Sequence, residues 1–454
     1  MFQTFRNAWK IRELRNKILF TLLILLIFRI GSAITVPFVN PEAFSLFNAE
    51  AQNNFMQIVS MMSGGGFSDA SIFALSITPY INASIIIQLL TVAIPALERL
   101  AKDGENGRKK LATITRYVTV ALGLLLGVAY YFMILNNEKH PIESFSLGWD
   151  FLIAVMIVLT FTAGSALMMW LGEQINEKGI GNGISMLLFA GILSRTPVAL
   201  MNMWNMFYNS GILALSDDAG NAMKYLIGVP MTLVIFIVMI GFIVFMTNAE
   251  RRVPVQYAKR VVGRKMYGGQ NTFIPIKVNM SGVMPIILAV SIISLPMILG
   301  QFVGAVYDNG GYKAGWNWLS WFESTHPFYV VLYFVLIIAF AFFYVTIQYN
   351  PLEMANNLRR NSGVIPGYRP GKPTSDYIKR VINKVTFIGA VFLGIVAVFP
   401  SVFGVITEAF GVQGLGAGLT IGGTSIMIVV SVALETTQQI ESQMMMRHYK
   451  GFLE

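Results

Sequence analysis

Ten apolar runs of about 20 residues constrain this chain more than any other feature of its sequence. A bilayer core about 30 Å thick offers no water to the backbone, and a run of this length crosses it only as a helix. The runs are 18–37, 71–96, 112–135, 151–171, 183–206, 224–247, 282–303, 327–347, 385–404 and 417–439. Charged residues make up only 12% of the 454 residues, against about 25% in soluble domains. The sequence predicts an all-α polytopic membrane protein with ten transmembrane helices.

Lysine and arginine are divided unevenly between the two sets of alternating connections. The segments 1–17, 97–111, 172–182, 248–281, 348–384 and 440–454 carry 27 of the 33 basic residues, whereas the alternate segments carry only Lys139, Lys224 and Lys313. Segments rich in basic residues stay on the cytoplasmic side of a membrane. We therefore expect a multi-pass protein of the cytoplasmic (inner) membrane with both termini in the cytoplasm.

A short pattern recurs between the first and last five spans. Pro79-x-Ile81 in the second span reappears 206 residues later as Pro285-x-Ile287 in the seventh. Since five spans separate the copies, they cross the membrane in opposite directions, which predicts two inverted, pseudo-symmetric halves with a pathway between them. The chain accordingly divides into a segment 1–17, an N-terminal half 18–206, an outer linker 207–223, a C-terminal half 224–439 and a cytoplasmic tail 440–454.

The segment 1–17 places Phe2, Phe5 and Trp9 on one helical face, with basic residues elsewhere. This pattern predicts an interfacial helix on the cytoplasmic surface. The alternative is a disordered basic tail.

The second span is unusual both inside and upstream. Asn82 would be costly against lipid, so it is expected to face the bundle or a wet cavity, and Pro79 is expected to bend the helix. The upstream apolar piece 55–62 is too short to cross the membrane and is followed by Gly64–Gly66, which form a hinge at little steric cost. These features predict a segment that folds back into the membrane.

Two of the basic connections are long enough to form structures of their own. Residues 248–281 alternate valine and tyrosine with basic residues, and Gly268-Gly269 is expected to turn between two β-like arms. Residues 348–384 contain the Pro/Gly-rich run 366–371, which predicts a rigid exposed tip. Their length and their mixture of apolar and basic residues favour docking of large anionic or acidic partners. The alternative is that they only set the topology.

The sequence offers few groups for catalysis. It contains no Walker A loop, no HExxH and no GxSxG pattern, it has no cysteine, and its three histidines lie outside the span interiors or at their ends. Glu98 and Glu435 sit at span ends. We therefore expect a protein that is not an enzyme, with no cofactor and no metal. The alternatives are an ion-coupled secondary transporter of a small solute, which would need buried relay groups, and an intramembrane enzyme.

Several long motifs resemble the bacterial SecY family, the central subunit of the protein-translocation channel. They are Ile77–Leu90, Trp170–Ser185 (WLGEQINEKGIGNGIS), Glu250–Arg260 (ERRVPVQYAKR), Pro275–Pro285 (PIKVNMSGVMP), 357–371 (NLRRNSGVIPGYRPG), Gly422–Ser425 (GGTS) and Ile440–Tyr449. The resemblance covers essentially the whole chain in order. It implies a channel that translocates unfolded secretory polypeptides and releases membrane segments laterally into the bilayer.

The resemblance also implies roles for particular residues. A ring of aliphatic side chains that closes the pore maps to Ile81, Ile85, Ile184, Leu188, Ile287 and Ile428. A plug and its hinge map to Phe55, Ile58, Met61, Met62, Gly64, Gly65, Gly66 and Phe67. A lateral gate, with spans two and three facing spans seven and eight, maps to Thr78, Asn82 and Ser291. Taken singly, the ring residues could be ordinary packing aliphatics, and the plug segment could be a helix on the outer leaflet.

The implied partners dock mainly on the two large basic connections. Binding of the ribosome or the motor ATPase SecA maps to Arg251, Arg252, Arg260, Arg359 and Arg369. SecE- and SecG-type small membrane subunits, substrates with signal sequences and the lipid bilayer complete the set. The chain lacks an energy-transducing motif, so the energy for transport is expected to come from these partners.

Overall fold

Long helices dominate the chain. A computed structural model describes residues 2–40, 60, 63–135, 150–208, 219–257, 260–262, 265–267, 271–302, 315–323, 326–409 and 423–450. The helices are α1 (Phe2–Lys10), α2 (Arg12–Ala33), α5 (Thr78–Ala93), α6 (Pro95–Lys102), α7 (Gly104–Leu135), α8 (Asp150–Lys178), α9 (Gly183–Asn205), α10 (Ala219–Asn248), α11 (Met284–Phe302), α12 (Pro327–Gln348), α13 (Pro351–Arg360), α14 (Lys372–Ala409) and α16 (Gly423–Lys450), together with the 3₁₀ helix η3 (Asn317–Phe322). The strands are β1 (Glu250–Tyr257), β2 (Arg260–Val262), β3 (Lys265–Tyr267), β4 (Asn271–Lys277) and β5 (Gly363–Val364).

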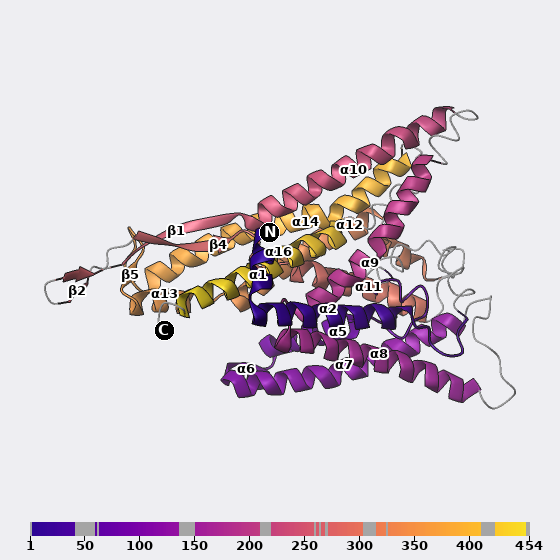
Figure 1. The fold of residues 1–454 in the computed structure, drawn as a ribbon, viewed down its shortest axis with the longest axis horizontal. Helices are drawn as coiled ribbons and strands as arrows, with labels where there is room; N and C mark the ends of the chain where they lie inside the picture. The colour runs from indigo at the N-terminus through magenta and orange to yellow at the C-terminus, as the bar shows by residue number, and fades with distance from the viewer. Residues whose placement is uncertain are drawn as a thin grey trace.

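The prediction of a ten-helix polytopic membrane protein is confirmed. Each predicted span overlaps one of α2, α5, α7, α8, α9, α10, α11, α12, α14 and α16. By length and composition, seven of the described helices can cross a membrane, α5 qualifies only together with α6, and α11 is a shorter apolar helix. Figure 1 shows these helices running roughly side by side along the long axis of the molecule.

The second span differs from the prediction at both ends. Residues 72–77 form turns, and the helix begins only at Thr78. Pro79 therefore starts α5 and does not bend it, because proline lacks only an N–H that is unpaired anyway in a first helical turn. The sharp bend, of 103°, lies at Ile94 before Pro95, where α6 turns away from α5.

Several helices extend beyond the predicted spans into polar sequence. α7 begins at Gly104 and α14 at Lys372, within connections that were expected to lie outside the spans. Hydropathy marks where a helix meets lipid, whereas helix formation continues through exposed polar residues. In the first turns of α7, for example, Lys109 forms an i,i+4 ion pair with Glu105 at 2.9 Å.

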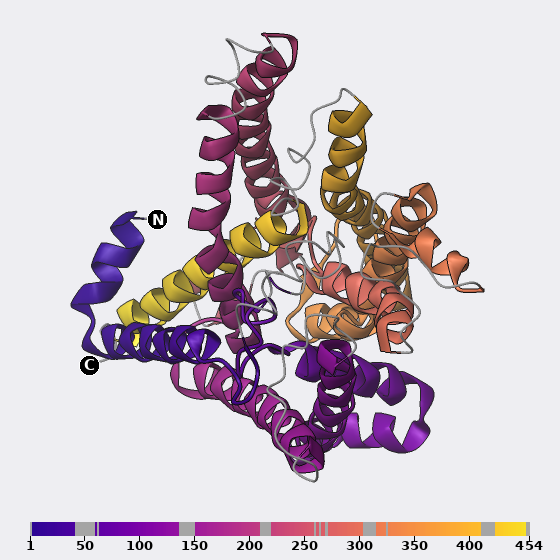
Figure 2. The same ribbon diagram turned by 90° about the vertical axis from the view of Figure 1, so that its right-hand side faces the viewer.

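The two halves form separate groups of helices on either side of a central cluster. In Figure 1, α2, α5, α7 and α8 lie below, α10, α12, α14 and α16 lie above, and α9 and α11 pass between them. The contacts repeat: α7 packs against α5 and α8, and α12 packs against α11 and α14. This repetition matches the predicted inverted relation between the halves. Figure 2, turned by 90°, shows that α16 crosses the centre of the bundle.

The two large basic connections form one structure, which we call the platform: β1, β4 and residues 351–384, which include α13, β5 and the first part of α14. β1 pairs antiparallel with β4, from Glu250↔Lys277 to Gln256↔Asn271, and its last residues pair with β5. Buried apolar residues of these elements, among them Val255, Leu358 and Ile378, pack into a hydrophobic cluster. The platform therefore has its own core, which holds the basic surface in place.

The two β-like arms are confirmed, but their turn is not where it was predicted. β2 pairs with β3 in the register Val262↔Lys265, so the chain reverses between these two residues. Gly268-Gly269 come after β3 in the sequence and lie outside the described residues.

Candidate functional site

The largest hydrophobic cluster, which we call the waist cluster, lies where the two halves meet. Its buried side chains come from α2, α5, α8, α9, α10, α11, α12, α14, α16 and the turn before α5; Phe28, Ile77, Met168, Leu187, Ile243, Ile286 and Val432 are examples. Its members are aliphatic and aromatic side chains together with methionine. Such a cluster excludes water and ions without binding either.

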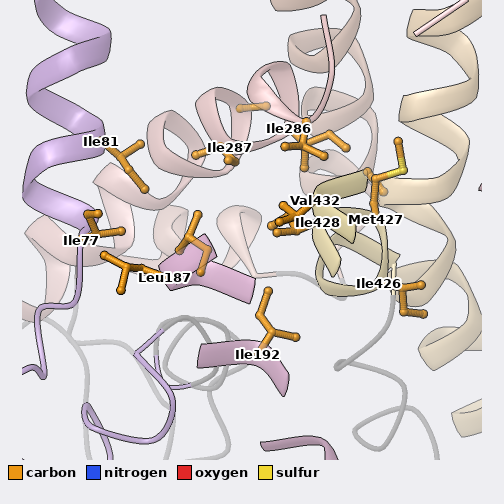
Figure 3. Packing of buried hydrophobic residues seen from close by; sticks show 14 of the residues in the cluster. Ile77, Ile81, Leu187, Ile192, Ile286, Ile287, Ile426, Met427, Ile428 and Val432 are labelled. Carbon is orange, nitrogen blue, oxygen red and sulfur yellow. The ribbon is translucent and has the colours of Figure 1, made fainter. Parts of the chain in front are cut away.

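All six residues predicted for the pore ring belong to the waist cluster. Ile81, Leu188, Ile287 and Ile428 are among its buried members, each at most 7% exposed, and Ile85 and Ile184 pack against it, partly buried. They come from four helices, α5, α9, α11 and α16, two in each half. In Figure 3, Ile77 and Ile81 from one side and Ile428 from the other project toward the same region, with Leu187 between them.

Local sequence sets the direction of the ring side chains. Pro79 starts α5, so that Ile81 and Ile85 lie one turn apart on one face. Asn182 caps α9, its side-chain oxygen accepting a hydrogen bond from the Ile184 N–H at 3.1 Å. Ile184 therefore lies in the first turn of α9.

The glycine turn predicted as a hinge is packed against the helices around it. Gly64 and Gly65 have φ of +66° and +96°, which glycine adopts without strain. The Arg29 guanidinium donates to the Gly64 carbonyl at 3.0 Å, and a Cβ on Gly65 would lie 2.0 Å from the guanidinium of Arg195. The turn therefore needs glycine for close approach as well as for conformation.

The rest of the predicted plug is only partly described. Phe67 is buried and packs against Tyr130 with tilted rings whose centroids are 4.7 Å apart, and its carbonyl accepts a hydrogen bond from the Tyr130 hydroxyl. Gly66 is buried in the same turn. Four members of the prediction, Phe55, Ile58, Met61 and Met62, lie outside the described residues.

Sequence reasoning missed Arg29 and Arg195 as partners of this turn. Both were visible as charges within apolar runs, and such charges usually face a partner. The partner here is a backbone turn far away in the sequence, which the residues around either arginine do not reveal.

The three residues predicted for the gate lie on the helices that meet between the halves. α11 contacts both α5 and α7. Thr78 and Asn82 on α5 and Ser291 on α11 are all partly exposed. They are therefore neither in the core nor fully on the surface.

The predicted docking arginines lie on the platform or on the β2–β3 hairpin beyond it. Arg251, Arg252, Arg359 and Arg369 are exposed, and Arg260 lies on β2. The Arg252 guanidinium pairs with Glu250 at 2.7 Å and lies over the Phe273 ring, 4.7 Å from its centroid.

Arg369 stands at a tip that is held rigidly. Its carbonyl accepts from the Thr374 hydroxyl at 2.7 Å, and the neighbouring Tyr368 stacks on Tyr377 at 4.3 Å. Its guanidinium is therefore displayed from a fixed backbone.

Comparison with known proteins decides the family. A family model described as SecY matches residues 71–437. The chain belongs to the SecY family. Protein translocase subunit SecY of Streptomyces galbus and that of Bacillus subtilis (strain 168) are each 40% identical to it over 462 aligned residues, with all of both chains covered.

Solved structures of the SecY and Sec61 channels share the fold. A chain described as "The structure of a protein conducting channel" matches with a TM-score of 0.63 at 19% identity, covering 94% of this chain and 92% of that one. A chain from "Sec61 in the Canine ribosome-channel complex from the endoplasmic reticulum" matches with a TM-score of 0.59 at 18% identity and the same coverage. The resemblance to SecY predicted from sequence is thus confirmed. The comparisons lend no support to the small-solute transporter.

Proposed function

We propose that this SecY-family chain is a protein-conducting channel that moves unfolded secretory polypeptides across the cytoplasmic membrane and releases apolar segments sideways into the bilayer. One observation carries the proposal: helices from both halves meet at one cluster of apolar side chains, and the six ring residues either belong to it or pack against it. Aliphatic side chains can seal around a chain of any sequence, because their contacts are not directional.

The ring, the plug and the gate have separate tasks in this proposal. The residues Ile81, Ile85, Ile184, Leu188, Ile287 and Ile428 close the pore at rest and line it around a moving chain. The plug predicted from sequence at residues 55–67 seats under the ring from the outer side and swings on Gly64–Gly66 when a chain arrives. A signal sequence, as an apolar helix, leaves between α5 and α7 on one side and α11 and α12 on the other, past Thr78, Asn82 and Ser291.

The platform is the docking site for whatever drives transport. Its exposed arginines suit the phosphates of ribosomal RNA and the acidic surface of a SecA-type motor. The ribosome complex of the Sec61 relative supports a ribosome as one partner. With SecE- and SecG-type subunits beside it, the chain lies in the cytoplasmic membrane with the platform and both termini in the cytoplasm, as its basic connections indicate.

Crosslinking of a stalled translocating chain tests the channel. The protein has no cysteine, so single cysteines at 81, 184, 287 and 428 can each be crosslinked to a stalled substrate without background. All four are expected to react. Ile237 on α10, which is 68% exposed, is the control position and is expected not to react. Reaction at 237 equal to that at the four ring positions would contradict the proposal.

Uptake by proteoliposomes tests the rival function. Vesicles that contain this chain alone are expected to take up no small solute in a saturable way. Saturable, ion-dependent uptake would instead identify a transporter.

A further inference from the structure

Exposed aromatic side chains gather at the ends of α11 and α12 that point away from the platform. α12 begins at Pro327 and runs toward the platform, and the 3₁₀ helix η3 lies shortly before its start. Trp318 and Trp321 of η3 are 44% and 53% exposed, and Phe328 in the first turn of α12 is exposed as well. This end of the bundle therefore presents large aromatic groups to its surroundings.

The rings contact one another and form one surface. We call it the aromatic bracket: Trp316, Trp318, Trp321, Phe322 and Phe328. The Trp318 ring lies 6.0 Å from that of Trp316 and 6.0 Å from that of Phe322. Phe322 and Trp321 each contact the Phe328 ring, with centroids 5.8 Å apart. Contacts between rings at these distances are favourable, so they hold the bracket together as a unit.

The bracket is attached to both helices. Leu319 of η3 is fully buried and packs against Met297 of α11. A Cβ on Gly300 would lie 2.5 Å from Leu319 Cδ1, so α11 has a glycine where η3 comes closest to it. Phe328 belongs to α12 itself. The bracket therefore joins the ends of two neighbouring helices at one level.

An exposed apolar face of α12 leads directly to the bracket. Phe328, Val331 and Val335 are three and four residues apart, so they share one face of the helix, and all three are exposed. α12 is long and apolar enough to cross a membrane, so we expect the two valines to face lipid. At Phe328 the exposed strip changes from aliphatic to aromatic. The bracket thus continues a lipid-facing strip beyond the end of the helix.

The composition of residues 315–323 suits the boundary between lipid and water. Asn317, Ser320 and Glu323 are interleaved with the tryptophans, and this segment contains no lysine or arginine. An indole combines an apolar ring with one N–H donor, and such side chains are enriched where acyl chains meet headgroups. In water the same rings would form an exposed apolar patch.

We propose that the aromatic bracket is a membrane anchor that binds phospholipid at the level of the glycerol and ester groups, in the leaflet opposite the platform. Its partner is the bilayer surface and not an anionic headgroup, because residues 315–323 bring no cation. The anchor holds the ends of α11 and α12 at one depth. It does not require conduction of a polypeptide, and only the assignment of this leaflet to the outer side rests on the proposed function.

Quenching by brominated phosphatidylcholine tests the depth of the bracket. The chain has seven tryptophans, so a protein that keeps Trp321 and has phenylalanine at the other six reports on this residue alone. Its emission is expected to fall most with bromine near the glycerol end of the acyl chain, and less with bromine near the methyl end. The matched control has phenylalanine at all seven positions and carries Val335→Trp, for which the reverse order is expected.

Every outcome decides for or against the anchor. Absence of quenching by either lipid would overturn it, with iodide in the water showing whether the ring lies in water or under protein. Stronger quenching from the methyl end would overturn it too, because the ring would then lie in the bilayer interior. If the six replacements prevent folding, Trp321→Phe in the otherwise unmodified chain is expected to lose part of the quenching by glycerol-end bromine, and no loss would contradict the proposal.

Melting in two media separates anchoring from packing. Trp321→Ala is expected to lower the melting temperature more in liposomes than in detergent, because a micelle adapts its shape to the protein and a bilayer keeps its thickness. Leu319→Ala is the control and is expected to lower it equally in both, since Leu319 is buried against α11. Equal shifts for Trp321→Ala in the two media would show that the ring only packs against its neighbours. A channel that moves no polypeptide would contradict the proposed function and leave the anchor standing.

Discussion

The waist cluster and the platform use their side chains in opposite ways. In the waist, the residues that fill the core, such as Leu188 and Ile428, are also the residues proposed to close the pore. In the platform, buried residues such as Val255 and Leu358 hold the fold, and exposed arginines carry the proposed function.

This difference predicts how each region responds to substitution. A change in the waist alters packing and sealing together, because one side chain performs both. Substitution of an exposed platform arginine alters docking but leaves the fold intact, because exposed charges contribute little to stability. The following predictions are ordered by the size of the expected effect.

A polar group in the waist is expected to have the largest effect. Ile428→Asn places an amide at a position only 5% exposed, which costs about 1–3 kcal/mol if the amide finds no partner. Opening removes this cost by admitting water, so the closed channel loses stability relative to the open one. Ion leak through resting vesicles and export of substrates with weak signals are both expected to rise about tenfold.

The matched control keeps the volume and the apolar character of the side chain. Ile428→Leu is expected to seal almost as well as the unmodified protein, since such exchanges usually cost less than about 1.5 kcal/mol. If Ile428→Asn leaked no more than Ile428→Leu, Ile428 would be an ordinary core residue and its place in the ring would be wrong.

Reversal of one platform charge is expected to have a smaller and more selective effect. Arg369→Glu places a negative charge on the rigid tip, which repels acidic partners and phosphates. Motor-driven export is expected to fall several-fold, with the melting temperature in detergent unchanged. Arg380→Glu, an exposed position on α14, is the control for net charge. Equal losses in the two variants would mean that only the overall charge of the platform matters.

The sequence predicted the elements that depend on local composition. The ten spans follow from hydropathy alone, and the ring residues followed from the resemblance to the SecY family, because their motifs were long. The start of α5 was misjudged, since Pro79 can bend a helix or begin one and only the packing of residues 72–77 decides between them.

Contacts between distant residues could not be predicted. The Gly181–Gln439 bond joins residues 258 positions apart, and nothing in the sequence around either residue indicates the other. Arg29 and Arg195 were conspicuous in sequence, but nothing near them indicated Gly64 or Gly65. The roles of the ring, gate and docking residues stay predictions.

Two ion pairs give the smallest effect and sharpen the comparison between buried and exposed groups. Glu98 on α6, beyond the bend, pairs with Lys102 at 2.6 Å, and that hydrogen bond lowers the pKa of the Glu98 carboxyl. A lowered pKa in the folded state gives stability that is present above the ordinary pKa of glutamate and is lost as the pH falls through the lowered value. Since both groups are largely exposed, Glu98→Gln is expected to melt at the same temperature as the unmodified protein at pH 7 and in acid.

The same substitution at Glu173 is the comparison. Its side chain is only 18% exposed and pairs with Arg116 at 2.9 Å between α7 and α8. Glu173→Gln removes the negative charge that pairs with the exposed Arg116 guanidinium, so it weakens a charge-assisted hydrogen bond between two helices and is expected to lower the melting temperature measurably at pH 7. Equal melting temperatures for the two glutamine variants would show that water reaches both ion pairs alike. Burial of a charged group would then not decide how much that group contributes to the stability of the fold.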